Sequence, residues 1–249
     1  MFDFQTMPTD KDTLYSVALD QVTDFRFDDQ VARVFPDMIK RSVPGYSHII
    51  AMIGVLANQY AQPDSQLYDL GSSLGAASLA MRHRVQTPGV RIVAVDNSQA
   101  MLDRARDFLE SEDLPVPVEC LCADITELEL KRASFVVLNF TLQFIAPQHR
   151  SQTLSRIYSG MLPGAALILS EKLCFDDPQQ DALLSKHHHD FKRANGYSDL
   201  EISQKRQAIE HVMLPETAQT HIDRLHAVGF KHVSQWFQSF NFASFIAIK

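Results

Sequence analysis

A seven-residue motif with two glycines brings together groups that could bind a ligand. It runs from Asp69 to Gly75 as DLGSSLG and follows a short apolar segment. Gly71 would let the backbone approach a ligand closely, and Gly75 would let a helix pack on a strand. The first turn of that helix would offer free N–H groups to an anion. The motif is neither G-x-G-x-x-G nor a P-loop, so by itself it also fits an ordinary strand-to-helix turn.

Polar residues also end the apolar segments that follow. Asp96 lies 25 residues after Gly71, Asp124 follows the next such segment, and Asn139 ends the one after that. A carboxylate at the end of a second strand can accept hydrogen bonds from both ribose hydroxyls of a nucleoside. Asp124 could reach an adenine amino group. Each acid could instead start a helix or a turn. Because all of these polar residues lie at expected strand ends, together they predict an adenosine-type ligand.

The segments between these residues alternate between strand and helix patterns, which predicts βαβ units and a mostly parallel, twisted sheet. Ligands bind such sheets at the carboxyl ends of the strands. The expected strands are Gln66–Leu70, Arg91–Asp96, Val116–Cys122, Ser134–Asn139 and Ala165–Ser170, and the expected helices between them are Ala76–Arg84, Ser98–Glu110 and Pro147–Leu162.

The flanks differ from this central pattern. Residues 1–45 are acidic and partly helical, with a helix expected over Asp28–Lys40, and we predict that they form a helical cover. Residues 46–249 would form one Rossmann-like domain with a polar helical insertion at about 177–210. After a helix at Pro215–Val228, the segments Val233–Phe240 and Phe242–Ile248 predict a closing antiparallel hairpin.

Composition narrows the functional classes. The net charge is −7 without a Lys/Arg-rich run, which argues against direct binding of nucleic acid through its phosphates. The longest uncharged apolar run, Ile49–Ala57, is far shorter than the ~20 residues of a membrane span. Three cysteines without framework spacing suit a reducing compartment, so we expect a cytoplasmic protein without membrane contact.

Other conspicuous residues favour structural roles. Cys120 and Cys122 lack the further ligands of a zinc site, and we expect no metal. Consecutive histidines at 187–189 point about 100° apart on a helix, which favours a solvated face, although His188 or His189 could line a pocket. Trp236 favours core or dimer packing. The pairs Lys192-Arg193 and Lys205-Arg206 favour ion pairs with nearby acids.

The pattern of Asp69, Gly71, Gly75, Asp96 and Asp124 resembles the class I S-adenosylmethionine-dependent methyltransferase fold. The likeness extends further and covers nearly the whole chain from about residue 10. It resembles the carboxy-S-adenosyl-L-methionine synthases in the segments VFPDMIKRSVPGY (34–46), YDLGSSLGAA (68–77), VDNSQAML (95–102), VVLNFTLQF (136–144), HHDFKRANGYSDLEISQKR (188–206) and WFQSFNFASFIAIK (236–249).

The resemblance implies a reaction and a set of ligands. S-adenosyl-L-methionine and prephenate would give carboxy-S-adenosyl-L-methionine, phenylpyruvate and water, by capture of the released CO₂ on a sulfonium ylide in a closed pocket. The product would serve a separate tRNA carboxymethyltransferase that completes the 5-oxyacetyl group of the wobble uridine. The resemblance also implies a homodimer, in which the arm that holds Arg206 could cross between the subunits.

The resemblance implies site residues as well. Arg206 would anchor the new carboxylate with its planar, two-pronged guanidinium. The family has Cys where this chain has Ser72, a change that keeps the backbone N–H. Matching positions for S-adenosylmethionine and its carboxylated product are Tyr46, Gly71, Ser72, Ser73, Asp96, Asn97, Asp124, Ile125, Asn139 and Arg206.

Two other functional classes stay open at this point. One is a conventional methyltransferase that acts on a small acid or on tRNA, although Asn139-Phe-Thr-Leu lacks the Asn/Asp-Pro-Pro-Tyr motif of base amino methylation. The other is a non-catalytic scaffold, which the intact Asp69, Asp96 and Asp124 disfavour. The 177–210 region also has apolar residues that would form an exposed patch on a monomer, namely Leu183, Leu184, Phe191, Ile202 and Ile209. Such a patch favours a homodimer.

Overall fold

The computed structural model describes residues 10–111 and 114–249. In chain order its elements are α1 (Asp29–Ser42), α2 (Tyr46–Tyr60), β1 (Gln66–Leu70), α3 (Ala76–Arg84), β2 (Arg91–Asp96), α4 (Gln99–Glu110), β3 (Val118–Cys122), β4 (Ala133–Asn139), the 3₁₀ turn η2 (Leu142–Phe144), α5 (Pro147–Gly160), β5 (Met161–Lys172), α6 (Pro178–Ala194), α7 (Asp199–Ile209), α8 (Ala218–Val228), β6 (His232–Ser239) and β7 (Phe242–Ile248).

The described strands form one 7-stranded sheet in the order β3-β2-β1-β4-β5-β7-β6. Strands β1 to β5 pair in parallel, and β7 pairs antiparallel with both β5 and β6. The order reverses between β1 and β4, which makes their carboxyl ends the topological switch point where ligands bind such sheets. The prediction of a mostly parallel α/β sheet with a closing hairpin is confirmed.

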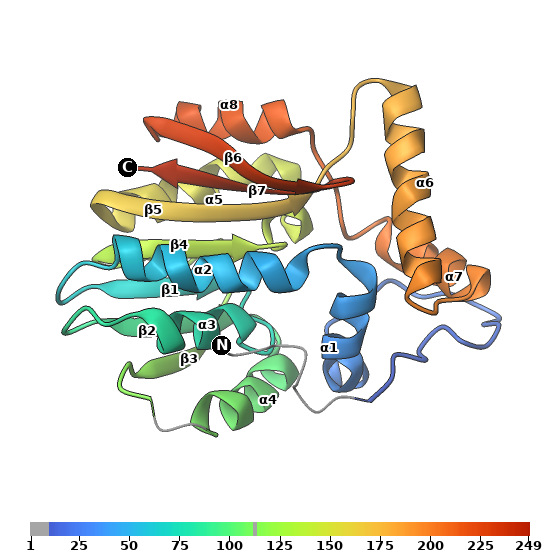
Figure 1. The fold of residues 1–249 in the computed structure, drawn as a ribbon, viewed down its shortest axis with the longest axis horizontal. Coiled ribbons are helices and arrows are strands. Elements are labelled where there is room, and N and C mark those ends of the chain that lie inside the picture. Colours follow the sequence, from blue (N-terminus) through green and yellow to red (C-terminus); the bar gives the residue numbers. More distant parts are fainter. Residues whose placement is uncertain (1–9, 112–113) are drawn as a thin grey trace.

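Helices cover both faces of the sheet (Figure 1). On one face α2, α3 and α4 pack against inward residues such as Leu67, Ile92 and Phe135. On the other face α5 and α8 pack against alternate residues of the same strands, such as Tyr68 and Val136. The interior strands are therefore buried on both sides, which explains why they are almost continuously apolar.

A third group of elements lies beyond one end of the sheet. There α1, α6 and α7 stand together, at the right of Figure 1, and the segment before α1 runs beside them. A small apolar cluster includes Phe25, Phe35 of α1, Met101 of α4 and Ala208 of α7. Buried Asp12 also holds this group, because its carboxylate accepts a hydrogen bond from Tyr197 and lies 3.7 Å from the Lys205 ammonium.

The structure corrects one expected helix boundary and divides the expected helical insertion. The helix expected to reach Leu162 ends at Gly160, and the turn at Pro163-Gly164 is a register shift inside β5, which starts at Met161. The polar helical insertion expected at about 177–210 consists of two helices, α6 and α7. It breaks at Gly196, whose φ of +85° favours glycine, and α7 restarts with a capping box in which Ser198 and Glu201 each bond the other's backbone N–H.

The expected boundary between a helical cover (1–45) and a Rossmann-like domain (46–249) stays a prediction. Residues 1–9 of that cover lie outside the described part of the chain. Within 10–111 and 114–249, no helix is both long and apolar enough to span a membrane. The apolar patch expected from the sequence is partly covered by the chain itself. Ile202 is buried, and Ile209 packs against the small apolar cluster that contains Phe35 and Ala208. Leu183 on α6 is exposed.

Candidate active site

A cavity of about 1070 Å³ opens at the carboxyl ends of β1, β2 and β4 and is covered by α1, α6 and α7. The structure brings all the sequence-predicted ligand positions together on its wall. These are Tyr46, Gly71, Ser72, Ser73, Asp96, Asn97, Asp124, Ile125, Asn139 and Arg206. Their individual roles stay predictions.

The loop between β1 and α3 is shaped by its glycines and by β2. Gly71 has a φ of +76°, and a Cβ there would lie 2.4 Å from the Thr141 side chain. Its backbone N–H donates to the Val95 carbonyl at 2.8 Å. A Cβ on Gly75 would lie 3.2 Å from Leu109, in agreement with its expected packing role. The loop is thus fixed against its neighbours before any ligand arrives.

Two carboxylates organise the backbone around this loop. Asp69 is buried and accepts hydrogen bonds from the Ser78 N–H at 2.9 Å and the Ser78 hydroxyl at 2.7 Å, and burial raises its pKa to about 6. Asp96 accepts from the Ser73 N–H at 2.8 Å and the Ser98 N–H at 2.9 Å. Burial raises the pKa of Asp96, and these N–H donors oppose that rise. Asp69 therefore supports the loop, and both carboxylates lie at the cavity wall.

Two polar atoms on the cavity wall have no partner within residues 10–111 and 114–249. They are the Asn139 Oδ1 and the Ser72 Oγ, and both are buried. A buried polar atom without a hydrogen bond costs stability unless a ligand or water satisfies it. By contrast, Asp124 is exposed and accepts from the N–H and hydroxyl of Thr126 at 2.8 Å. These features fit a polar ligand seated between the ends of β1 and β4.

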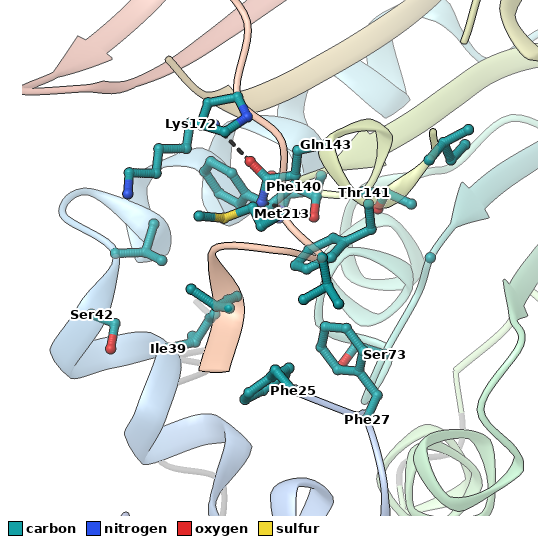
Figure 2. A pocket seen from close by; sticks show the side chains of 18 of the residues that line it. Phe25, Phe27, Ile39, Ser42, Ser73, Phe140, Thr141, Gln143, Lys172 and Met213 are labelled. Carbon is teal, nitrogen blue, oxygen red and sulfur yellow. Dashed lines mark hydrogen bonds between the residues drawn. The ribbon is translucent and has the colours of Figure 1, made fainter. Parts of the chain in front are cut away.

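Aromatic side chains close the cavity around these polar groups. Tyr46 at the start of α2 stacks on Phe140 with ring centroids 6.4 Å apart, and burial raises the pKa of the tyrosine. Phe27, from the segment before α1, meets Phe144 edge to face at 5.3 Å. In Figure 2, Phe25 and Phe27 lie on one side of the cavity and Phe140 on the other. This enclosure suits a reaction that must exclude water.

The loop after β4 is held by buried charges that the sequence did not single out. Both oxygens of Glu171 accept backbone N–H groups, from Leu142 at 3.0 Å and Gln143 at 2.9 Å. Burial raises the pKa of Glu171 to about 8, against the opposing effect of nearby Arg150. Figure 2 shows the Gln143 side chain, whose Oε1 accepts the Lys172 N–H at 3.0 Å. Glu171 and Gln143 therefore fix the cavity wall that the loop after β4 forms.

The covering side of the cavity is rich in cations. Lys172 at the end of β5, Lys192 of α6, and Lys205 and Arg206 of α7 all line it. Burial and the neighbouring Lys205 and Lys172 lower the pKa of Lys192 to about 7. Burial lowers the pKa of Lys205 to about 8, although Asp12 opposes this. The cavity thus has carboxylates at the ends of β2 and β3, and a group of cations at the end of β5 and on α6 and α7, with Asp181 and Glu210 among them.

The histidine and lysine expectations need correction. His188 is buried on the cavity wall, where its Nε2 lies 2.8 Å from the Ser42 carbonyl oxygen, and burial lowers its pKa to about 3. His188 is therefore not on a solvated face. Lys192 and Lys205 are buried as well, and only Arg193 makes the expected surface pairs, with Asp190 and Asp199. Helix α6 is polar because one of its faces lines the cavity.

The remaining conspicuous residues lie away from the cavity. Cys120 and Cys174 are half-buried and Cys122 is exposed, all as free thiols. No cluster of three or more His, Cys, Asp or Glu side chains in the described chain is placed to hold a metal ion. Trp236 packs against the core on the α2 face.

Residues 67–164 match the family model of the methyltransferase domain. The fold is similar to that of the cyclopropane synthase of Mycobacterium tuberculosis, with a TM-score of 0.57 and 15% identity over 76% of this chain and 64% of that one. It is equally similar to an S-adenosylmethionine-dependent methyltransferase of Methanosarcina mazei, with a TM-score of 0.57 and 17% identity over 78% and 96%. The fold and site thus define a class I S-adenosylmethionine-dependent methyltransferase-like protein.

Closer relatives define the family. The chain is 58% identical to the carboxy-S-adenosyl-L-methionine synthase of Trichlorobacter lovleyi, across 96% of this chain and 98% of that protein. It is 55% identical to the same enzyme of an Enterobacter species, across 97% and 98%. The chain belongs to the carboxy-S-adenosyl-L-methionine synthase family, and it is an enzyme whose substrate is S-adenosyl-L-methionine.

Proposed function

We propose that this enzyme converts S-adenosyl-L-methionine and prephenate into carboxy-S-adenosyl-L-methionine, phenylpyruvate and water. In this reaction the prephenate ring loses CO₂ and hydroxide as it becomes aromatic. The hydroxide takes a proton from the sulfonium methyl group and leaves as water, and the resulting carbanion forms a bond to CO₂. No side-chain base is needed, so the protein's task is to position the reactants and exclude water.

One observation carries this proposal beyond family membership: several cations line the cavity in addition to the acids at the strand ends. Asp96 and Asp124 at the strand ends suit the hydroxyls and amino group of an adenosine. Arg206, Lys192 and Lys172 also line the cavity, and a methyl donor alone has only its amino-acid carboxylate to offer these three cations. A dianionic co-substrate and a carboxylated product both call for positive charge there.

The direct test is to incubate the purified enzyme with both substrates and follow the nucleoside by mass spectrometry. We expect a product heavier than S-adenosylmethionine by one CO₂, formed only when prephenate is present. The same mass is expected for the nucleoside that co-purifies with the protein. A methylated acid or tRNA, with release of S-adenosylhomocysteine, would support the conventional methyltransferase instead.

Asp96→Ala tests the nucleoside end of the cavity. Because Asp96 would accept two ribose hydroxyls, its loss should weaken S-adenosylhomocysteine binding by about 1.5–3 kcal/mol for each hydrogen bond to the charged acceptor. Calorimetric titration measures this loss. Asp103→Ala is the matched control, because Asp103 lies on the exposed face of α4 and pairs only with surface groups. Unchanged affinity in Asp96→Ala would remove this residue from the site.

The product would be used outside this protein. We propose that a separate tRNA carboxymethyltransferase takes carboxy-S-adenosylmethionine to build the 5-oxyacetyl group of the wobble uridine. This division of labour is supported by the net charge of −7 and the absence of a Lys/Arg-rich run, which do not suit direct tRNA binding. A tRNA user of the product also implies that the enzyme works in the cytoplasm.

We further propose that the enzyme is a homodimer. Leu183 of α6 and Leu200 of α7 are exposed apolar residues on the covering helices, at 53% and 41% of their full area. Pairing with a second copy would remove them from water. Light scattering at micromolar concentration should give twice the 28.1 kDa mass of the chain. A clean monomer would disprove the dimer without affecting the proposed reaction.

A further inference from the structure

Two lysines of the cavity have no assigned role in the reaction. Lys172 lies at the carboxyl end of β5, and Lys192 lies on the inner face of α6. Neither ammonium has a hydrogen bond or an ion pair with any residue in 10–111 or 114–249, whereas Lys205 donates to the Ser42 hydroxyl at 3.2 Å and lies near Asp12. The two lysines therefore have charge to offer a ligand, as Arg206 also does.

Both lysines line the same cavity, and their charges act on common neighbours and on each other. Each contributes to lowering the pKa of buried His188, and Lys172 helps to lower the pKa of Lys192. Figure 2 shows Lys172 extending from the end of β5 toward the side where Ser42 lies, with Phe140, Ile39 and Met213 below it. Asp181 near Lys172 and Asp12 near Lys192 oppose the lowering of the two lysine pKa values only in part, so a bound anion would stabilise the two charges further.

We propose that Lys172 and Lys192 bind the carboxylate that the co-substrate keeps, while Arg206 receives the carboxylate that is transferred. This inference rests on the proposed function. A prephenate dianion carries one carboxylate on its ring, which leaves as CO₂, and a second on its pyruvyl side chain, which stays in phenylpyruvate. The apolar surface formed by Ile39, Phe140 and Met213 would accept the ring between the two anchoring sites.

The assignment separates two kinds of anion recognition in one cavity. The new carboxylate is attached to the nucleoside, so its anchor must lie within reach of the sulfonium carbon. The retained carboxylate leaves with the second product, so it needs a separate anchor that releases a monoanion. Flexible lysine point charges suit this exchange, whereas the planar guanidinium of Arg206 suits a carboxylate held in fixed geometry.

The test uses Lys172→Gln and Lys192→Gln, which keep chain length and polarity but remove the charge. We expect the KM for prephenate to rise at least about tenfold in each variant, while S-adenosylhomocysteine affinity stays within about twofold of wild type. Lys186→Gln is the control, because Lys186 is an exposed residue of the same helix and should leave both constants unchanged. Lys192→Arg, which keeps the charge, should recover part of the loss.

Phenylpyruvate makes the test selective, because this product carries only the retained carboxylate. Its inhibition should weaken in Lys172→Gln and Lys192→Gln and persist in Arg206→Ala. Unchanged KM for prephenate in both lysine variants, or loss of phenylpyruvate inhibition only in Arg206→Ala, would overturn the inference while the proposed reaction stands. If the wild-type enzyme makes no carboxylated nucleoside from prephenate, the proposed function fails and this inference fails with it.

Discussion

Arg206→Ala should lose affinity for carboxy-S-adenosylmethionine by about 2–5 kcal/mol, the usual loss when one partner of a charge pair that the bound ligand covers is removed. Affinity for S-adenosylmethionine should change far less. The two ligands share adenine, ribose, sulfonium and amino-acid groups, so Asp96 and Asp124 cannot distinguish them. They differ by one carboxylate on the sulfonium carbon, and only a cation near that carbon can recognise it.

The structure supports this role for Arg206. The residue belongs to α7 and is exposed where it lines the cavity. Across residues 10–111 and 114–249, no hydrogen bond or ion pair engages its guanidinium, in contrast to Arg41, which donates to the Asn195 carbonyl and pairs with Asp37. Arg206 is thus the arginine of this wall that is available to a ligand.

Calorimetric titration of both ligands against wild type and Arg206→Ala measures the difference. Arg206→Lys should restore affinity only in part, because a point charge replaces a planar fork. Arg193→Ala is a suitable control, since Arg193 is an exposed residue of α6 that makes surface ion pairs of little energetic consequence. An equal loss for the two ligands would show that Arg206 holds a group they share, such as the amino-acid carboxylate.

The strand ends could be predicted from the sequence because their pattern is local. A short apolar run that stops at Gly71, Asp96 or Asn139 marks both the strand and the edge that faces a ligand. The same rule applied to β5 would have indicated Lys172, which directly follows a buried strand. The expected strand stopped at Ser170, whereas β5 continues to Lys172, where Glu171 and Lys172 still pair with β7.

The covering side could not be read in this way, because its residues meet only in the folded chain. His188, Lys192 and Lys205 occur in a polar segment with low apolar content, which is also typical of a solvated helix. Their burial depends on the break at Gly196, which folds α7 back beside α6, and on Asp12, which lies 193 positions before Lys205. No spacing along the chain reports such a contact.

Arg150→Met should cost about 3–5 kcal/mol of unfolding free energy, because it removes a fully buried cation from several partners at once. Arg150 donates to the carbonyl oxygens of Ile145 and Leu214 at 2.8 Å and of Gln143 at 3.1 Å. Its Nη1 also lies 2.6 Å from the Glu216 Oε2. A methionine fills the volume but leaves these buried oxygens without a donor.

The same substitution should loosen the cavity, although Arg150 does not line it. Its partners belong to two cavity walls, the loop after β4 and the segment at 213–216 before α8. We therefore expect weaker S-adenosylhomocysteine binding together with the lower stability, measured by calorimetric titration and by urea unfolding. Gln152→Met, an exposed position on the same helix, should stay within about 0.5 kcal/mol of wild type. If Arg150→Met were equally stable, the buried arginine would not be what joins these walls, and the cavity would have to owe its shape to Glu171 and the apolar contacts alone.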